Sequence, residues 1–209
     1  MRVFIALILL LNAVHGQVYK SGDERVKRWG RAAVKVRQVA QVDRVVARIL
    51  RNKARYVSVD DESQVPWYVI AVLHNMESGG SFRHHLHEGS PLSGRTRWVP
   101  KGRPKWGKPP YKWEDSAKDA LAYDKMGGVR WAYLFDTLWA IERYNGSGYW
   151  RYHRAVPSPY LYAGTTIEKR GKYVSDGKWS STARSKQIGA AAILKRLEAK
   201  CVIDFRRLR

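Results

Sequence analysis

The stretch from residue 74 to residue 93, HNMESGGSFRHHLHEGSPLS, holds the side chains with the clearest capacity for chemistry: two glutamates, Glu77 and Glu88, and four histidines. Hydrolysis of a glycosidic bond needs a proton for the leaving oxygen and usually a second carboxylate, which activates water or stabilises positive charge. Histidines and carboxylates can instead bind a metal ion. The stretch is therefore a candidate acid pair, a candidate metal site or a polar loop without chemistry.

Glu77 lies where a buried helix is expected to end. The residues before it, VPWYVIAVLH at 65–74, form an apolar run that predicts a helix buried on most sides, with Pro66 in its first turn and Gly79-Gly80 ending it. A carboxyl group in the last turn of such a helix is desolvated, and its pKa should rise, as a general acid working near neutral pH requires. Glu88 follows a flexible SGGS segment, so we expect it to approach Glu77 from the facing loop.

The metal alternative rests on side chains of the ligand type, namely His74, His84, His85, His87 and Glu88. The helical H-E-x-x-H spacing is absent, and no third ligand stands in a defined setting, so we expect no metal. A metal-dependent amidase is the alternative that this leaves open. The sequence also lacks a G-x-S-x-G elbow and any glycine loop of a nucleotide site, so we expect neither a serine nucleophile nor a nucleotide cofactor.

The elements that must position these side chains are mainly helical. Apolar residues recur at spacings of three and four from Asp23 to about Arg55, which predicts one or two basic amphipathic helices packed on a larger body. Further helices are expected at about 113–126, 133–144 and 182–199. Residues 90–112 predict a long ordered loop or short hairpin, and residues 149–175 an extended or looped surface. No repeat or linker divides the chain.

The first residues, MRVFIALILLLNAVHGQ, have the layout of a secretory signal, with an apolar run too short to span a membrane. We expect cleavage after residue 16 and export to the periplasm or the medium. The single cysteine, Cys201, allows no intramolecular disulfide bond. We expect a monomer stabilised by packing alone.

The chain of 209 residues has 39 Lys and Arg against 18 Asp and Glu, a net charge of +21. Such a charge attracts polyanions, which include nucleic acid, anionic lipid and bacterial wall polymers. Nine Trp and twelve Tyr, many in predicted loops, could stack on sugars or on bases. Charge and aromatic content therefore favour a polymeric partner without naming it.

Seven separated motifs together resemble a known family. They are PWYVIAVLHNMES, FRHHLHEGSPL, R-x-x-x-V-P-x-G-R-P, IERYNGSGY, SPYLYAGT, GKYVSDG and QIGAAAILKRL. In that order they are similar to a family of bacterial and phage lysozyme-like proteins that cleave peptidoglycan, within the lysozyme superfamily of mostly helical folds. The resemblance covers about residues 60 to 198.

The resemblance implies that Glu77 is the catalytic acid. Many phage members carry H-L-H-N-G-D-P-L where this chain has H-L-H-E-G-S-P-L at 85–92, so Glu88 stands at the Asn position and Ser90 at the Asp position. Glu88 is then the candidate for the second carboxylate. The H-L-H-E-G pattern is also similar to that of lysozymes from predatory bacteria that enter the periplasm, which implies a substrate whose glucosamine lacks its acetyl group.

These considerations predict a lysozyme-like helical domain at 60–209, with a long loop or short β-hairpin region beside the catalytic helix, and a basic helical extension at 17–59. The predicted activity is that of a secreted muramidase acting on peptidoglycan glycan strands, with Glu77 and Glu88 catalytic. Predicted substrate-binding residues are His74, Ser78, His85, His87, Tyr144, Asn145 and Tyr160. A lytic transglycosylase and a non-catalytic, cationic protein that binds peptidoglycan or nucleic acid stay as alternatives, and retention or inversion at the sugar is open.

Overall fold

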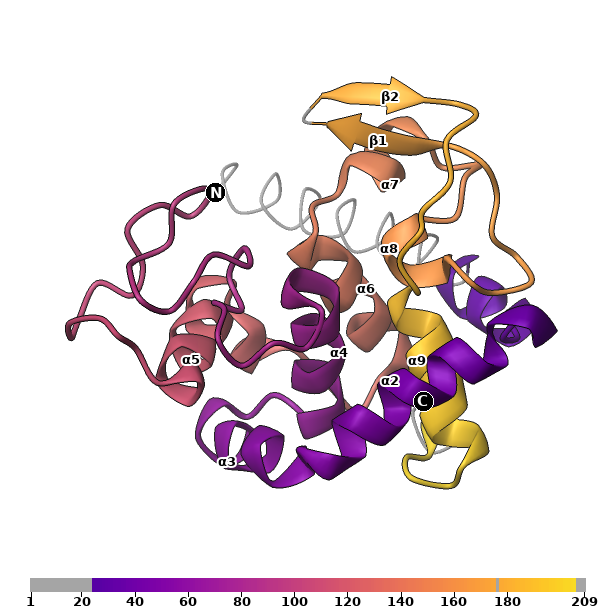
Figure 1. Ribbon diagram of the computed structural model, residues 1–209. Helices are drawn as coiled ribbons and strands as arrows, with labels where there is room; N and C mark the ends of the chain where they lie inside the picture. The colour runs from indigo at the N-terminus through magenta and orange to yellow at the C-terminus, as the bar shows by residue number, and fades with distance from the viewer. Residues whose placement is uncertain (1–23, 176, 206–209) are drawn as a thin grey trace, which may run out of the picture.

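The computed structural model describes residues 24–175 and 177–205, so the expected signal peptide at 1–16 lies outside the described residues. Helices dominate, which confirms the predicted mainly α class (Figure 1). After a helix at 24–31, the elements are η1 (Val36–Gln38), α2 (Val39–Arg51), α3 (Lys53–Ser63), α4 (Trp67–Ser78), α5 (Trp113–Tyr123), η2 (Met126–Gly128), α6 (Leu134–Tyr144), α7 (Gly148–Tyr152), α8 (Pro159–Tyr162), β1 (Lys172–Ser175), β2 (Lys178–Ser180) and α9 (Ala190–Ala199). No described helix is long and apolar enough to cross a membrane.

Helix α4 is the central element, and every residue from 69 to 76 is buried. It packs between α3 and α9 (Figure 1). Its first turn begins one residue later than predicted: Pro66 is the N-cap, and the N–H of Trp67 donates to the Asp60 carboxylate at 2.9 Å. Gly79 ends the helix with φ +62, a conformation that glycine adopts at little cost. The predicted end of the buried helix, just after Glu77, is therefore confirmed.

The N-terminal helices contribute directly to the hydrophobic core. Helix α2 buries Val42, Val46 and Ile49 against α9 and the body, as its amphipathic pattern predicts. Trp29, within the helix at 24–31, and Ala32, just after it, belong to the same core cluster as the buried residues of α4. On the outside, the carboxylate of Asp43 accepts two 2.8 Å hydrogen bonds from the Arg196 guanidinium. The segment predicted as an extension thus shares one core with the rest of the described chain.

Residues 81–112 form one long loop, which includes the loop predicted at 90–112 and begins earlier, and they do not form a hairpin. Their backbone shows only one isolated bridge, between His84 and Pro91. The sheet lies elsewhere: β1 and β2 pair antiparallel at 172–180. Of the two predicted alternatives, a long loop or a short hairpin, the structure therefore has the loop beside α4.

Two other segments differ from the prediction. The stretch at 149–175 holds α7, α8 and β1, and the burial of Leu161 and Tyr162 shows that it is more than a surface loop. The last helix begins at Ala190 and not at Thr182, and its N-cap residue Gly189 has extended backbone angles, φ −77 and ψ 159. A Cβ atom on Gly189 would lie 2.5 Å from the Leu161 carbonyl oxygen, so this backbone packs directly on α8.

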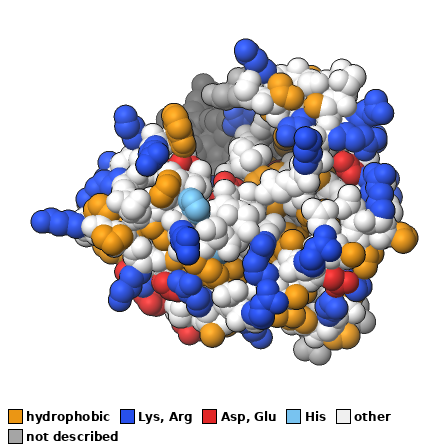
Figure 2. All heavy atoms as spheres, in the orientation of Figure 1, with side chains coloured by type: hydrophobic (Ala, Val, Ile, Leu, Met, Phe, Trp, Pro, Cys, Tyr) orange, Lys and Arg blue, Asp and Glu red, His pale blue; other side chains and the backbone are white. Residues whose placement is uncertain are grey.

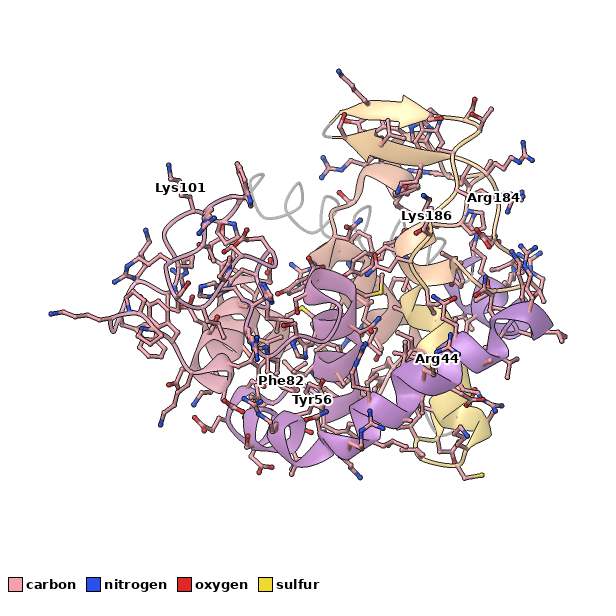
Figure 3. The ribbon with its side chains drawn as sticks, viewed as in Figure 1. Arg44, Tyr56, Phe82, Lys101, Arg184 and Lys186 are labelled. Atoms are coloured by element: carbon pink, nitrogen blue, oxygen red, sulfur yellow. The ribbon has the colours of Figure 1, made fainter. Side chains whose placement is uncertain are left out.

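The loop at 81–112 and the hairpin stand on opposite sides of the C-terminal end of α4 (Figure 1). Helix α5 lies with the loop, and α7 and α8 lie with the hairpin. Figure 2 shows this face of the molecule hollowed between the two sides, with Lys and Arg side chains on both rims. Lys101 belongs to the loop rim, and Arg184 and Lys186 belong to the hairpin rim (Figure 3).

Candidate active site

Glu77 lies in the last turn of α4, and its carboxylate is partly buried. Its Oε1 accepts a 2.6 Å hydrogen bond from the hydroxyl of Tyr160, which comes from α8. The pKa of Glu77 is raised to about 7, mainly by burial and less by the negative charges of Asp124 and Glu88, while the Tyr160 hydrogen bond opposes the rise. A carboxyl group in this state holds its proton near neutral pH and can donate it.

Glu88 approaches from the loop because the loop backbone rests on the end of α4. Gly89 has φ +80, and a Cβ atom there would lie 2.6 Å from the Glu77 carbonyl oxygen. The Oε1 atom of Glu88 accepts hydrogen bonds from the Ser90 hydroxyl and, at 3.3 Å, from the Ser90 N–H. The other oxygen, Oε2, is buried without a hydrogen-bond partner among the described residues. The two predicted catalytic glutamates are therefore neighbours, and one Glu88 oxygen has no hydrogen-bond partner among the described residues.

Asp124 is a third carboxylate at this site, and the sequence reasoning did not find it. It follows the last turn of α5 and is half-buried, and burial raises its pKa while the charge of Arg143 opposes the rise. Its charge raises the pKa of Glu77 more than that of Glu88 does. The end of α4 therefore faces two carboxylates, one from the loop and one from α5.

Two tyrosines complete the wall around Glu77. The hydroxyl of Tyr144, from α6, donates a 3.1 Å hydrogen bond to the Leu86 carbonyl oxygen and so fixes the loop to α6. Burial, with the charges of Glu77 and Asp124, raises the pKa of Tyr144 well above its usual range, and it does the same for Tyr160. Both hydroxyls therefore stay protonated at neutral pH and act as hydrogen-bond donors.

His74 lies in the core, where a substrate cannot touch it. Its Nδ1 is 3.0 Å from the Tyr56 hydroxyl, and its ring packs against Phe82 and Trp113 with centroid separations of 4.6 and 4.5 Å (Figure 3). Burial lowers its pKa to about 4, so the ring is neutral. The predicted substrate-binding role does not fit this position, because the His74 ring is fully enclosed by core side chains.

His85 and His87 are also buried, and they hold the loop on α5. His85 Nδ1 lies 2.6 Å from the Ser116 hydroxyl, and its Nε2 lies 2.8 Å from the Gly94 carbonyl oxygen. His87 Nε2 lies 2.8 Å from Asp119, whose carboxylate also accepts hydrogen bonds from Arg103. Direct substrate contact, as predicted for both histidines, is not available to rings enclosed in this way.

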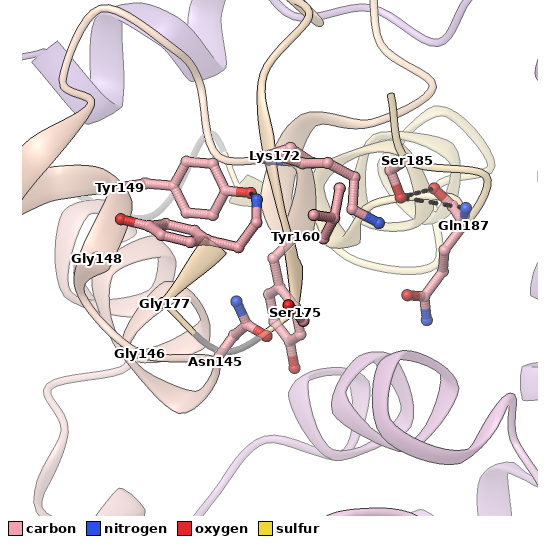
Figure 4. A pocket seen from close by; sticks show the side chains of 13 residues that line it. Asn145, Gly146, Gly148, Tyr149, Tyr160, Lys172, Ser175, Gly177, Ser185 and Gln187 are labelled. Atoms are coloured by element: carbon pink, nitrogen blue, oxygen red, sulfur yellow. Dashed lines mark hydrogen bonds between the residues drawn. The ribbon is translucent and has the colours of Figure 1, made fainter. Parts of the chain in front are cut away.

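The remaining predicted residues divide between the helix end and a pocket. The Ser78 hydroxyl donates to the His74 carbonyl oxygen at 3.1 Å, so it stabilises the last turn of α4. Asn145 is exposed after α6, and together with Tyr160 it lines a pocket of about 540 Å³ on the hairpin side (Figure 4).

This pocket was not predicted from the sequence. Its other lining residues are Gly146, Gly148, Tyr149, Pro159, Lys172, Tyr173, Val174, Ser175, Gly177, Ser185 and Gln187. Glu77 does not line it, but two of its wall residues reach the end of α4. Tyr160 donates to the Glu77 carboxylate, and Gln187 donates to the Met76 carbonyl oxygen at 2.7 Å. The pocket therefore adjoins the carboxylate cluster across Tyr160.

Within residues 24–175 and 177–205, no three His, Cys, Asp or Glu side chains converge as metal ligands would. Comparisons of the chain with protein-family models, with curated proteins and with solved structures found no match. The case for a function therefore rests on the site itself.

Proposed function

We propose that the protein is a secreted muramidase, which hydrolyses the MurNAc-β-1,4-GlcNAc bond of bacterial peptidoglycan in a lysozyme-like helical domain. The observation that carries the proposal is Glu77: a carboxyl group with a pKa raised to about 7, held by Tyr160 beside a pocket and a second carboxylate. A general acid works best when its pKa lies near the working pH. The resemblance of seven motifs to lysozyme-like proteins supports the same reaction.

In this proposal Glu77 donates its proton to the leaving glycosidic oxygen. The Tyr160 hydroxyl stabilises the carboxylate that remains, because a hydrogen bond to a charged acceptor is stronger than one to a neutral acceptor. Glu88 activates water or stabilises the positive charge that develops on the sugar. Glu88, with Asp124 near it, also gives the site negative charge, which suits a glucosamine ammonium. The proposed substrate is therefore peptidoglycan whose glucosamine lacks its acetyl group.

The proposal is tested with purified peptidoglycan, intact and chemically deacetylated, and with mass spectrometry of the released fragments. We expect muropeptides with reducing ends, and a rate that falls roughly 10²–10⁴-fold in Glu77→Gln, since general acid catalysis contributes this much. Glu62→Gln is the matched control, because Glu62 is an exposed residue of α3 whose carboxylate pairs with Lys118 on the surface. Full activity in Glu77→Gln would overturn the proposal.

The same digestion separates the alternatives. A lytic transglycosylase would leave anhydro ends on the released fragments. A non-catalytic binding protein would release no muropeptides and would bind wall or nucleic acid with a steep dependence on salt, because binding through many cations releases counterions.

The second carboxylate is identified by two further variants, Glu88→Gln and Asp124→Asn. Both remove a negative charge that raises the pKa of Glu77, so both should lower the pH at which activity is lost. We expect Glu88→Gln also to lower the maximal rate and Asp124→Asn to preserve it. The reverse pattern would assign the role to Asp124.

A further inference from the structure

We propose that the pocket beside Tyr160 binds the carboxylate-bearing part of the glycan strand, the muramic acid unit with its stem, and that Lys172 recognises this carboxylate. The inference rests on the proposed muramidase function and deepens it. It assigns the muramic acid unit to the pocket on the hairpin side of Glu77.

The pocket has the size and the walls of a sugar site. Its volume of about 540 Å³ lies within the usual range for small-molecule pockets. Three of its wall residues are Tyr149, Tyr160 and Tyr173, and tyrosine rings offer apolar faces for sugar rings together with polar tips. Between these rings the polar groups of Asn145 and Ser175 can meet sugar hydroxyls (Figure 4).

The walls are preformed by contacts within the hairpin side. The hydroxyl of Tyr149 accepts a 3.2 Å hydrogen bond from the Tyr173 N–H, and the two rings meet edge to face with centroids 5.4 Å apart. Behind them Trp179 stacks on His153 with a centroid separation of 3.5 Å and an angle of 8°. A ligand can therefore bind without ordering the pocket first, which lowers the cost of binding.

Lys172 gives the pocket its charge. Among the described lining residues it alone is charged at neutral pH, and no Asp or Glu among the described residues forms an ion pair with it. Figure 4 shows its side chain extending toward Ser185 and Gln187. An ammonium on a partly buried residue in a pocket whose other groups are neutral favours an anionic ligand, and the carboxylates of a lactyl group or a stem peptide are anions of peptidoglycan.

The two parts of the site thus carry opposite charges on either side of Tyr160. Glu77, Glu88 and Asp124 form the acidic part, and Lys172 marks the basic part. A strand that alternates a glucosamine ammonium with a muramic acid carboxylate matches this order only in every second register. The charge separation therefore sets the register in which the strand binds, although the whole protein is strongly cationic.

The test is calorimetric binding to Glu77→Gln protein, which holds ligands without cleaving them. The probes are a MurNAc-containing disaccharide with its stem peptide, the same disaccharide without the stem, and a GlcNAc disaccharide, which has no carboxylate. Lys172→Met should weaken binding of the carboxylate-bearing probes roughly tenfold or more and leave the GlcNAc disaccharide unchanged, as expected for one charge-assisted contact. The lactyl carboxyl is an amide in the stem-bearing probe, so a loss with that probe alone identifies the stem as the carboxylate source, and a loss with the stemless probe alone identifies the free lactyl carboxylate. A loss with both shows that Lys172 accepts a carboxylate at either position.

Lys172→Arg should retain binding, and Lys101→Met is the matched control, because Lys101 is exposed on the opposite rim. An equal loss for all three probes, or no loss for any, would overturn the inference. Displacement of the probes by a short single-stranded oligonucleotide would overturn it in favour of a general polyanion site. If the native protein hydrolyses peptidoglycan but Lys172→Met does not change the binding of any probe, this inference fails and the muramidase proposal stands. If the native protein binds the carboxylate-bearing probes selectively through Lys172 but hydrolyses no peptidoglycan, the muramidase proposal fails.

Discussion

The Tyr160 hydroxyl and the Glu77 carboxylate are joined by a 2.6 Å hydrogen bond across 83 residues of chain. The bond ties the last turn of α4 to α8, so the candidate acid is held from two elements. It also stabilises the ionised form of Glu77 and so lowers the pKa of this carboxyl group, against burial and the charges of Asp124 and Glu88. Burial nevertheless outweighs it, and Glu77 remains a proton donor near pH 7.

The first prediction concerns this hydrogen bond. Tyr160→Phe removes a donor to the carboxylate, so the pKa of Glu77 should rise, and activity on peptidoglycan should persist to a pH about one unit higher. The measurement is the pH profile of kcat/KM for the two proteins. Tyr149→Phe is the matched control, since Tyr149 lines the same pocket without contacting Glu77. An alkaline limit that stays in place or moves downward would contradict the assigned role.

The second prediction concerns stability as a function of pH. The pKa of Glu77 is about 7 in the folded state against an ordinary 4.5, so the folded state binds the proton more tightly than the unfolded state between these values. Stability is therefore lost as the pH rises from about 4.5 to 7, by at most roughly 3 kcal/mol. Glu77→Gln cannot ionise, so it should be more stable than the native chain at pH 8 and equal to it at pH 4.

Urea unfolding at the two pH values measures this difference. Gln keeps an oxygen that accepts the Tyr160 hydrogen bond, so the comparison isolates the charge. Equal stability of the two proteins at pH 8 would show that the Glu77 carboxylate is not desolvated in solution.

The third prediction uses two glycines with similar backbone conformations. Gly79 and Gly89 have φ values of +62 and +80, so alanine is strained at either position by about 1 kcal/mol. A Cβ atom at Gly79 meets nothing within 4 Å, whereas at Gly89 it would lie 2.6 Å from the Glu77 carbonyl oxygen. Gly79→Ala should therefore keep most of the activity, and Gly89→Ala should lose much more because it moves Glu88 away from Glu77.

Turnover of deacetylated peptidoglycan and urea unfolding, measured together, separate activity from stability in this pair. Equal activity in the two variants would mean that the contact between the loop and the end of α4 does not position Glu88.

Local signals in the sequence sufficed for α4, α5 and α6 and for the position of Glu77 at a helix end, but not for α7, α8 or the start of α9. The apolar run before Glu77 and the glycine at position 79 fix the end of α4 through backbone conformation alone, which needs no knowledge of the rest of the chain. The helices α5 and α6 begin and end within a few residues of their predicted limits for the same reason. The pairing of β1 with β2 had a signal too, the Asp-Gly pair at 176–177, which is typical of tight hairpin turns.

The rest of the candidate site depends on tertiary contacts that no local pattern reveals. A histidine can be a metal ligand, a base or a core residue, and its burial in the folded protein decides which. His74, His85 and His87 all proved to be buried. Asp124 reaches the site because Arg143 of α6 donates to its carbonyl oxygen at 2.8 Å and so fixes the end of α5. The pocket around Lys172 joins segments from 145 to 187, and only the packed fold brings them together.

The last prediction concerns a buried cation that holds the first described helix on the body. The Arg25 guanidinium lies over the Trp150 ring at 3.7 Å and the Trp139 ring at 4.3 Å, and its Nε donates to Glu142 at 3.1 Å. Burial lowers the pKa of Arg25 and raises that of Glu142, so desolvation outweighs the attraction of the pair. Removing one partner leaves the other charge buried and alone, which typically costs about 3–5 kcal/mol.

Arg25→Leu should therefore destabilise the protein by about that amount in urea unfolding at pH 7. The loss should shrink at acid pH, because the isolated Glu142 has a raised pKa in the folded state and is stabilised by protonation. The double variant Arg25→Leu/Glu142→Leu should recover most of the stability, since two apolar side chains replace the ion pair without leaving a charge. A double variant no more stable than Arg25→Leu would instead assign the stabilisation to the stacking of Arg25 between Trp139 and Trp150, which leucine cannot reproduce.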